Sequence, residues 1–404
     1  MTHPNTSTFS QIYLPKFQMY QEQLLSCIET LVNIDSGTGQ VEGVNQVIAY
    51  LEEWLRELDF TVSLHPTASY GSNLVAHRKG KGKTRILLVG HVDTVYGAGA
   101  AQTNPFTIRD GVAYGPGVID MKSGDVICIY AMRALIESGF DQYGELWIVF
   151  NNDEEVGSPE STPLLRQIAQ QVDIGLVLES SRDREILTHA RKGSDKYVLE
   201  IAGVSAHSGA EPHKGRSAVI ELAHKMIAIH HLNTFYPGVT FNVTRITSTE
   251  PLNIIPDMAR CYISVRAHNR QGLDLASAAL ENIAASCFVP DTHATLTRVL
   301  GRRPYERTPK VMALIEMAQK EGQALGLQIK SEGKGGVSDA NLLMEVGIPA
   351  LDSLGPTGGG MHNLSREHLH IDSIPIRGAL LTGLIHRLCL SESTGKEPST
   401  LPVQ

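Results

Sequence analysis

The sequence has little of what marks several large classes of protein. Its five cysteines are odd in number and widely scattered over 404 residues. This usage favours buried thiols in a reducing compartment over a disulfide framework or a zinc finger. No stretch approaches the roughly 20 apolar residues of a membrane-spanning helix, and the first twenty residues hold no apolar run of signal-peptide length. We therefore expect a cytoplasmic protein with no membrane partner.

Positive charge is also scarce. Lys and Arg number 35 against 43 Asp and Glu, which gives a formal net charge of −8. An acidic balance argues against nucleic acid or an anionic membrane surface as the main partner. The sequence has no internal repeat and no low-complexity segment. Its length predicts a sizeable core divided over two or three domains.

Two common catalytic motifs are missing. The glycine-containing stretch at residues 115–124 lacks the G-x-x-x-x-G-K-[ST] spacing of a phosphate-binding loop. The stretch at residues 205–209 lacks the G-x-S-x-G elbow of a serine hydrolase. A nucleotide-binding α/β protein stays open as a third option, to be separated by comparing zinc binding with nucleotide binding.

What the chain does contain is a set of apolar runs separated by helical patterns. Short runs without alternation predict strands covered on both faces, and strands that alternate with helices predict a mostly parallel sheet flanked by helices. Residues 97–117 are rich in Gly, Ala, Asn and Pro and are interpreted as a long loop. The expected strands lie at 61–64, 73–77, 85–90, 147–150 and 174–178, and the expected helices at 24–32, 44–58, 121–135 and 159–171.

The pattern changes near residue 190. Between residues 197 and 299 the order becomes strand, helix, two strands, helix, strand, which predicts a compact α+β unit of the βαββαβ type. After residue 304 the α/β pattern resumes. We therefore predict an α/β domain formed by residues 1–191 and 304–404, with an inserted domain at 192–303.

Acidic residues crowd the end of the central predicted strand. Asp153, Glu154 and Glu155 follow directly after the apolar residues 147–150. Adjacent carboxylates repel, and a fold tolerates them where water, a cation or a shared proton compensates. A helix is expected to start just after them, with Ser158 as its N-cap, and the alternative is that the acidic residues only favour the dipole of its first turn. These residues alone leave both interpretations open.

Other polar residues follow the neighbouring strands. His91, Asp93 and Glu179 also fall at predicted strand ends, and ligand sites in open α/β sheets collect at that edge. Asp120 precedes a helix and alone would be an N-cap, while His362 follows a glycine-rich run. Imidazoles and carboxylates together suit zinc or a related first-row ion. Their convergence favours a metal site over separate structural roles.

Four stretches carry a resemblance to a known family. They are residues 90–95, 115–122, 153–158 and 361–363. In this order they resemble the co-catalytic di-zinc exopeptidases and deacylases that include bacterial glutamate carboxypeptidase, acetylornithine deacetylase and succinyl-diaminopimelate desuccinylase. The similarity runs from about residue 24 to residue 390 and is closest to the glutamate carboxypeptidase branch.

The resemblance implies a hydrolase that cleaves an amide bond and releases a C-terminal amino acid, with glutamate as the candidate, from a small peptide or N-acyl amino acid. It also implies two Zn²⁺ per subunit, for which Co²⁺ or Mn²⁺ could substitute. Two alternatives stay open: an N-acyl amino acid deacetylase of the acetylornithine deacetylase type, and a non-catalytic metal-binding homologue.

The resemblance further assigns roles to the clustered residues. It implies a cis peptide between Asp120 and Met121. Asp153 has no implied role, and we expect it to make local hydrogen bonds. The implied roles are His91 and Glu179 as ligands of one metal, Glu155 and His362 as ligands of the other, Asp120 as the bridge, Glu154 as general base, and Asp93 as the partner of His91.

The inserted domain contributes further residues by resemblance. His207 matches the family histidine that reaches a neighbouring subunit's active site as an oxyanion donor, which implies a homodimer through the inserted domain. Asn253 and Arg266 match residues that bind the substrate carboxylate, for which the planar fork of Arg is suited. Arg303 and Gly336 match two more substrate contacts, with Arg302 as the alternative to Arg303.

Overall fold

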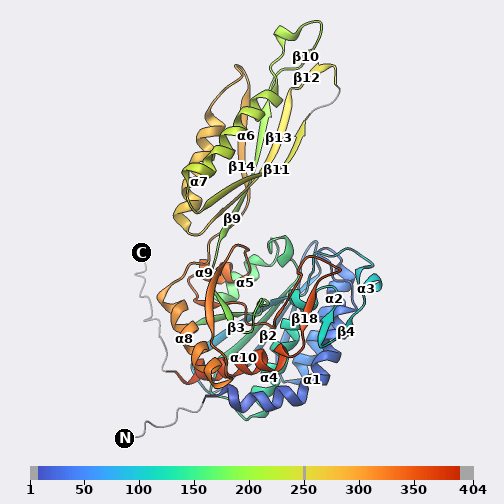
Figure 1. Ribbon diagram of the computed structural model, residues 1–404, viewed down its shortest axis with the longest axis vertical. Helices are drawn as coiled ribbons and strands as arrows, with labels where there is room; N and C mark the ends of the chain where they lie inside the picture. Colours follow the sequence, from blue (N-terminus) through green and yellow to red (C-terminus); the bar gives the residue numbers. More distant parts are fainter. Residues whose placement is uncertain (1–7, 249–251, 392–404) are drawn as a thin grey trace. The chain divides into compact units, whose positions relative to one another are not determined.

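The computed structural model describes residues 8–248 and 252–391 and divides the chain into two compact units (Figure 1). Within the described residues, unit 1 comprises the chain up to His189, Arg307–Glu332 and everything from Ser338 onward. Unit 2 comprises Ala190–Glu306 together with Gly333–Val337. None of the described helices has the length and apolarity needed to cross a membrane.

A six-stranded sheet forms the centre of unit 1. Four strands are mutually parallel, and β1 and β2 add an antiparallel edge. The predicted mostly parallel sheet is therefore confirmed. In spatial order the strands are β1 (Thr61–Pro66), β2 (Ser72–Lys79), β6 (Glu145–Asn151), β3 (Arg85–His91), β7 (Ile174–Val177) and β16 (Ala350–Leu351).

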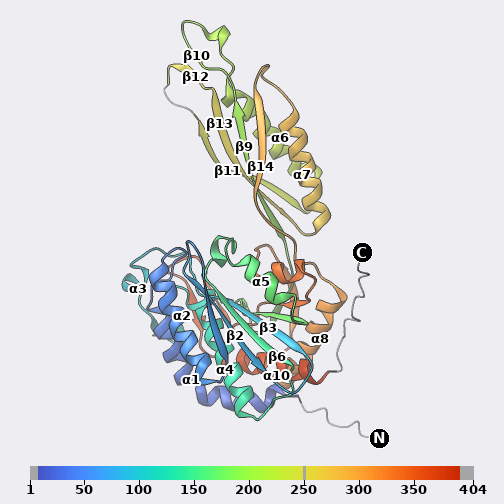
Figure 2. The same cartoon turned by 180° about the vertical axis from the view of Figure 1, so that it is seen from behind.

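Helices cover both faces of this sheet (Figures 1 and 2). In β3, Ile86 and Leu88 join the large core cluster under the helices of one face, while Leu87 and Val89 point to the other face because side chains alternate along a strand. The first face carries α1 (Ser10–Val32), α2 (Val41–Glu57), α4 (Ser123–Glu137), α8 (Pro309–Ala324) and α10 (Ser373–Leu390), and the second carries α5 (Thr162–Ala169) and α9 (Ala340–Glu345).

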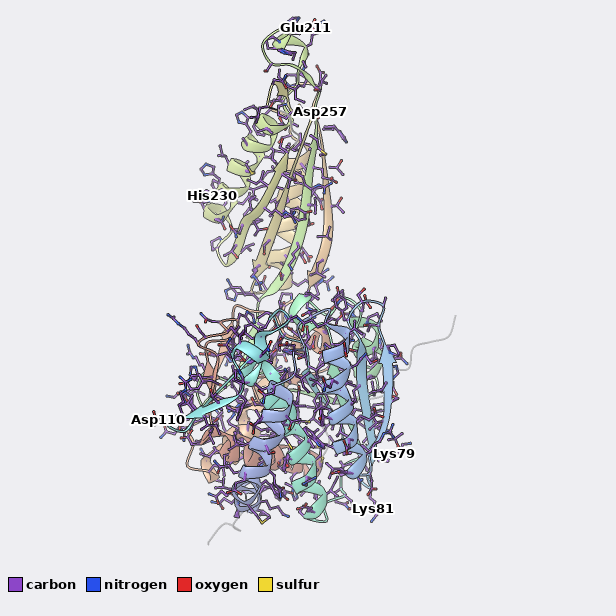
Figure 3. All side chains as sticks on the ribbon, turned by 90° about the vertical axis from the view of Figure 1, so that its right-hand side faces the viewer. Lys79, Lys81, Asp110, Glu211, His230 and Asp257 are labelled. Carbon is purple, nitrogen blue, oxygen red and sulfur yellow. The ribbon has the colours of Figure 1, made fainter. Side chains whose placement is uncertain are left out.

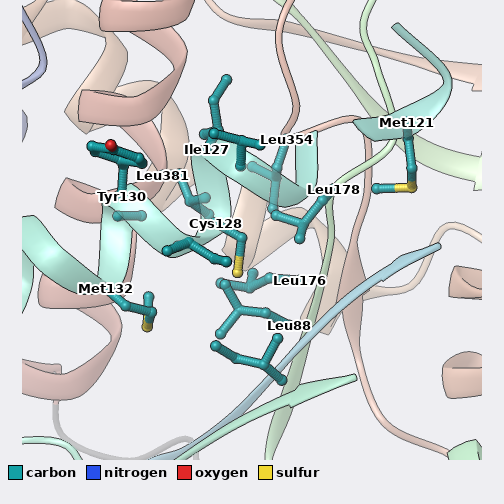
Figure 4. Close-up of a cluster of buried hydrophobic side chains, with 14 of the residues drawn as sticks. Leu88, Met121, Ile127, Cys128, Tyr130, Met132, Leu176, Leu178, Leu354 and Leu381 are labelled. Atoms are coloured by element: carbon teal, nitrogen blue, oxygen red, sulfur yellow. The ribbon is translucent and has the colours of Figure 1, made fainter. Parts of the chain in front are cut away.

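The core reaches the carboxyl end of the parallel strands. Leu88 and Leu176 pack with Cys128 of α4, and Met121 and Leu178 lie at the edge of the same cluster (Figure 4). Met121 and Leu178 are each next in sequence to one of the predicted ligands. Their burial anchors the backbone on which Asp120 and Glu179 stand.

The predicted loop at residues 97–117 is wrong in part. It contains α3 (Ala100–Thr103), β4 (Thr107–Arg109) and β5 (Val112–Tyr114). β4 and β5 form a second sheet with β17 (Gly358–Gly359) and β18 (His368–His370), which lie far along the chain. Strands of two or three residues are too short to leave a periodic pattern. Their pairing joins the segment before Asp120 to the segment around His362.

Two helix boundaries also differ from the prediction. α1 begins at Ser10 rather than near residue 24, with Pro15 in its early turns. α5 begins at Thr162, and Ser158 is not its N-cap. The backbone of Ser158 has φ of 49°, and its hydroxyl donates to Asp339 Oδ1 at 2.8 Å. Helix N-caps have an extended backbone, so this left-handed residue ends the preceding turn instead.

Unit 2 has the predicted βαββαβ order. Its antiparallel sheet runs β11-β13-β9-β14 and packs on two helices. Charged side chains such as Glu211, and also His230 of α6, stand on its surface (Figure 3). The predicted α/β fold with an inserted α+β unit is thus confirmed. The elements are β9 (Gly193–Ala202), α6 (Ala218–Phe235), β11 (Val239–Ser248), β13 (Met258–Ala267), α7 (Arg270–Ala285) and β14 (His293–Arg302).

Short elements complete the chain. β10 (Ala206–His207) pairs with β12 (Ile254–Ile255) beyond one end of the unit 2 sheet (Figure 1). β8 (Ile186–Arg191) pairs with β15 (Lys330–Lys334) in a separate two-stranded sheet. The remaining turns are a π-helical segment η1 (Val118–Lys122) and the 3₁₀ turns η2 (Glu154–Val156) and η3 (Pro212–Lys214).

Candidate metal centre

Strand register brings the predicted acidic and imidazole residues to one edge of unit 1. His91 is the last residue of β3 and lies opposite Asn151, the last residue of β6. Val177 at the end of β7 pairs with Val89. The turn η2, which carries Glu154 and Glu155, and the residue Glu179 therefore emerge beside His91. This is the edge on which the sequence placed them.

Four side chains form two groups that share Asp120. His91 Nε2 lies 3.3 Å from Asp120 Oδ1 and 4.0 Å from Glu179 Oε1. His362 Nε2 lies 3.2 Å from Asp120 Oδ2 and 3.3 Å from Glu155 Oε2. Within each group, the candidate ligand atoms all lie within 4.8 Å of one another. Asp120 offers one oxygen to each group, and the peptide between Asp120 and Met121 is cis, as expected.

The geometry of both groups fits divalent cations. Two atoms that each lie about 2.1 Å from a tetrahedral zinc ion are about 3.4 Å apart. Three of the four His–carboxylate distances, at 3.2 to 3.3 Å, are close to this value, and the fourth, between His91 and Glu179, is 4.0 Å. His91 Nδ1 donates to the backbone carbonyl of Asp93 at 3.0 Å, so Nε2 is left facing the carboxylates. Among the described residues, this buried Nε2 has no hydrogen-bond partner.

Negative charge dominates the cluster. The carboxylates of Asp120 and Glu155 raise the pKa of His362 to about 10. Burial works to lower the pKa of His91, but Asp120 and Asp93 outweigh it and hold that pKa well above its usual range. Burial raises the pKa of Glu155, whereas the two imidazoles outweigh burial at Asp120 and lower its pKa. A divalent cation at each group would place positive charge beside these carboxylates.

Asp93 has a second task that the sequence did not reveal. Its carboxylate lies 3.4 Å from His91 Nδ1. The same carboxylate accepts the backbone N–H groups of Glu154 at 3.1 Å and Glu155 at 3.2 Å, and the Thr38 hydroxyl at 2.7 Å. Asp93 thus connects the end of β3 to the turn that carries the proposed general base.

The three consecutive acidic residues point to different partners. Glu154 lies near enough to contribute to the raised pKa of His91, and Glu155 lies beside His362. Asp153 faces the other way: its Oδ2 accepts the backbone N–H groups of Glu160 at 2.7 Å and Ser161 at 3.2 Å. The expected local hydrogen bonding of Asp153 is confirmed.

At one end of unit 2, His207 and Asn253 lie together. His207 pairs with Ile254 across β10 and β12, and the Ser208 N–H donates to the Asn253 carbonyl at 3.0 Å. His207 Nδ1 accepts the N–H groups of Gly209 at 3.2 Å and Ala210 at 3.0 Å. Both His207 and Asn253 are exposed.

The other predicted substrate residues lie at the opposite end of the unit 2 sheet. Arg266 pairs with Ser194 near the start of β9, and its guanidinium donates to the Gly335 carbonyl at 3.3 Å. Gly336 is next in the chain. Arg303 donates to Asp274 at 3.1 Å and is partly exposed, whereas the alternative, Arg302, is 3% exposed. The two sets of residues are separated by the length of β13.

Several buried polar residues around the centre were not found from the sequence. Lys122 Nζ donates to the carbonyls of Leu31 at 2.9 Å and Ile34 at 2.8 Å, and burial lowers its pKa to about 8. Glu367 accepts the backbone N–H of Asp120, and the hydroxyl of the half-buried Tyr96 donates to Glu367. Lys122 lies within one of the four stretches, but nothing in the local sequence marks Glu367 or Tyr96.

Comparisons with known proteins agree with this fold and cluster. The model of peptidase family M20/M25/M40 matches residues 87–387. Carboxypeptidase G2 of Pseudomonas sp. is 32% identical over 372 residues, covering 90% of this chain and 89% of that protein. Succinyl-diaminopimelate desuccinylase of Bordetella parapertussis is 27% identical over 320 residues, covering 74% and 81%.

Solved structures show the same fold. Aminopeptidase PepT from Bacillus cereus has a TM-score of 0.75 at 21% identity, covering 90% of this chain and 98% of that one. The M20 family metallo-carboxypeptidase Sso-CP2 from Sulfolobus solfataricus has a TM-score of 0.69 at 16% identity, with the same coverage. The chain belongs to peptidase family M20/M25/M40 and is an amide-bond hydrolase of the metallopeptidase type. The family resemblance inferred from the four stretches is confirmed.

Proposed function

We propose that the protein is an exopeptidase that holds two divalent cations, Zn²⁺ first and Co²⁺ or Mn²⁺ as substitutes. It removes a C-terminal amino acid, with glutamate as the candidate, from a small peptide or N-acyl amino acid. The observation that carries the proposal is the position of Asp120, which offers one oxygen to each of two His–Glu pairs. The similarity to carboxypeptidase G2 supports the choice of a C-terminal residue as product.

The residues around Asp120 divide the chemistry between them. When bound, a pair of such cations lowers the pKa of a shared water and polarises the scissile carbonyl. Glu154 takes the proton from the attacking water and later delivers it to the leaving amine. Asp93 holds the ring of His91 and, through two backbone N–H groups, the turn on which Glu154 stands.

His207 is suited to stabilise the developing oxyanion. Its Nδ1 accepts two backbone N–H groups, so the proton of the neutral ring is held on Nε2. Because His207 is exposed, its Nε2–H is a donor available to a substrate. A fixed N–H donor aimed at the oxyanion supplies transition-state stabilisation beyond that of the cations.

The length of β13 supports a site shared between two subunits. Met258 and Arg266 are eight residue steps apart on this strand, which at about 3.3 Å per step is roughly 26 Å. Asn253 lies beyond the Met258 end, so one carboxylate cannot contact both Asn253 and Arg266 of a single chain. We therefore propose a homodimer through the inserted domain at residues 192–303, in which one subunit supplies His207 and Asn253 and the other supplies Arg266, Arg303 and Gly336.

Two features bear on the alternatives and on location. The similarity to desuccinylases makes an N-acyl amino acid hydrolase the second candidate function. The presence of Glu154 and His207 weighs against a non-catalytic homologue.

The five cysteines are all free in the structure, which supports a cytoplasmic location and a reducing compartment. Residues 1–191 with 304–404 form the proposed catalytic domain.

The test is a substrate panel on zinc-loaded protein, comparing peptides that end in Glu, Asp or a neutral residue with N-acetyl amino acids. We expect hydrolysis of C-terminal glutamate substrates, and we expect Glu154→Gln to retain two zinc ions while kcat falls by about 10²- to 10⁴-fold. Glu160→Gln is the matched control, because its carboxylate accepts the loop N–H groups of Ala68 and Ser69 and not those of the Glu154 turn. Unchanged turnover in Glu154→Gln would overturn the assigned role, and activity confined to acetyl-amino acids would favour the deacetylase.

A further inference from the structure

A buried carboxylate stands behind the candidate metal centre. Glu367 is 1% exposed and follows His362 by five residues. We infer that Glu367 is a positioning residue that fixes the turn carrying Asp120, and through it the placement of both cations. The inference rests on the proposed function, because it gives Asp120 the role of the bridging ligand.

The contacts of Glu367 are directed at the backbone of that turn. Its Oε1 accepts the N–H groups of Ile119 at 3.0 Å and of Asp120 at 3.2 Å. Its Oε2 accepts the N–H of Gly117 at 3.2 Å and the Tyr96 hydroxyl at 2.5 Å. The carboxylate therefore fixes the peptide on the N-terminal side of Asp120, which sets the direction of the Asp120 side chain.

The same carboxylate joins three segments that carry predicted ligands. Tyr96 follows His91 by five residues, and its N–H donates to the Thr94 hydroxyl at 3.4 Å. The N–H of Glu367 itself donates to the carbonyl of Asn363, the residue after His362, at 2.8 Å. Glu367 thus connects the segments of His91, Asp120 and His362 without facing a cation itself.

The buried position of Glu367 disfavours its negative charge. Burial raises its pKa, and the nearby Asp120 carboxylate raises it further, while the bonds from Tyr96 and the backbone oppose this rise. Every partner of the two oxygens is a donor, so both oxygens must be acceptors. Glutamine is nearly the same size, but one of its two terminal groups is an NH2 donor. In one orientation this NH2 faces the N–H of Gly117, and in the other it faces the N–H groups of Ile119 and Asp120. The Glu367→Gln substitution therefore disturbs the turn without opening a cavity.

The experiment compares Glu367→Gln and Tyr96→Phe with the wild-type protein and a matched control, Glu321→Gln. Glu321 is also fully buried and accepts a backbone N–H, that of Ser10 at 2.7 Å, but it joins α1 to α8 away from the metal centre. Two quantities are measured: amide hydrogen exchange of residues 117–120 in metal-free protein, and Zn²⁺ affinity by competition with a chromophoric chelator.

We expect Glu367→Gln to speed exchange at residues 117–120 and to weaken Zn²⁺ binding by about 10-fold or more, as loss of an outer hydrogen-bond partner does in other metal sites. Tyr96→Phe changes both quantities in the same direction by less. Glu321→Gln lowers the melting temperature and leaves both unchanged. The inference would be overturned if Glu367→Gln kept the wild-type amide exchange rates and Zn²⁺ affinity. It would also be overturned if Glu321→Gln changed these two quantities as much as Glu367→Gln does. If Glu367→Gln does not fold, wild-type values in Tyr96→Phe would overturn it.

The two proposals can fail separately. If the wild-type protein binds fewer than two zinc ions, the proposed function is wrong, and a bridging role for Asp120 with it. If the wild-type protein binds two ions and hydrolyses its substrate while Glu367→Gln keeps wild-type exchange and affinity, only the positioning role of Glu367 is wrong.

Discussion

The carboxylate of Asp93 accepts the backbone N–H of Glu154 at 3.1 Å. Through this bond, the residue that orients His91 also holds the turn that carries the proposed general base. One side chain therefore couples a proposed metal ligand, His91, to the proposed general base, Glu154. We expect a substitution at Asp93 to disturb both the ring of His91 and the turn that carries Glu154. A residue that contacted only the histidine ring would affect His91 alone.

The first prediction is that Asp93→Asn weakens metal binding and slows turnover together. Asparagine keeps one acceptor oxygen but cannot serve His91, Glu154, Glu155 and the Thr38 hydroxyl at once. We expect a loss of about 10- to 100-fold in Zn²⁺ affinity, with a fall in kcat that persists at saturating zinc. Thr38→Val, which removes the hydroxyl bond to Asp93 at 2.7 Å and a longer one to the Thr94 carbonyl at 3.4 Å, is the milder comparison. A kcat restored in full by excess zinc would show that Asp93 does not act on the Glu154 turn.

The second prediction concerns the sharing of the site between subunits. We expect His207→Ala to lower kcat by about 10²- to 10³-fold, with little change in zinc content. Equal amounts of His207→Ala and Glu154→Gln subunits, exchanged into mixed dimers, should regain about one quarter of wild-type activity, because half of the dimers then hold one complete site. Rates that stay at the level of the separate variants would contradict completion by the neighbouring subunit.

The third prediction separates the three consecutive acidic residues. Asp153→Asn removes one acceptor from the N–H groups of Glu160 and Ser161, so we expect the free energy of unfolding to fall by about 1 kcal/mol while kcat stays near the wild-type value. Urea unfolding and steady-state kinetics measure the two effects. A loss of turnover comparable to that of Glu154→Gln, without loss of stability, would place Asp153 in the chemistry instead.

The fourth prediction is a pH effect far from the metal centre. His386 stacks on Phe9 with ring centroids 3.9 Å apart, and Tyr13 Oη lies 2.7 Å from its Nδ1. Burial, together with the nearby Arg387, lowers the pKa of His386 to about 4. An unfolded histidine takes up a proton near pH 6.5, about 2.5 units before the folded one does. The contribution of His386 to stability is therefore complete above pH 6.5 and is lost as the pH falls toward 4.

His386→Phe keeps the ring stacking but cannot take up a proton. In metal-free protein, we expect the melting temperature to fall less between pH 7 and pH 5 in His386→Phe than in the wild type. His230→Phe, on the exposed surface of α6 (Figure 3), is the control and should keep the wild-type pH dependence. Parallel curves for His386→Phe and the wild type would contradict the lowered pKa.

The sequence predicted the convergence at the sheet edge for a simple reason. Parallel strands that are covered on both faces leave continuous apolar runs, and the residues after each run must emerge at the same edge. His91, Glu154 and Glu179 could be located in this way. The assignment of individual roles came from the resemblance, because an apolar run says nothing about which carboxylate faces which atom.

The parts that escaped prediction depend on contacts between distant segments. The two-residue strand β17 and the three-residue strands β4, β5 and β18 have too few residues for periodicity to show. Glu367 finds the N–H groups of the Asp120 turn only after the chain has folded, since 247 positions separate Glu367 from Asp120. Ser158 resembles a helix cap in sequence, but its left-handed backbone and its bond to Asp339 are set by tertiary structure.

The most direct test of the account is the anomalous scattering of zinc in crystals of the zinc-loaded protein. The account predicts two peaks per chain about 3.5–4 Å apart, one beside His91 and Glu179 and the other beside Glu155 and His362, with Asp120 between them. A single peak, or two peaks that do not share Asp120, would contradict it.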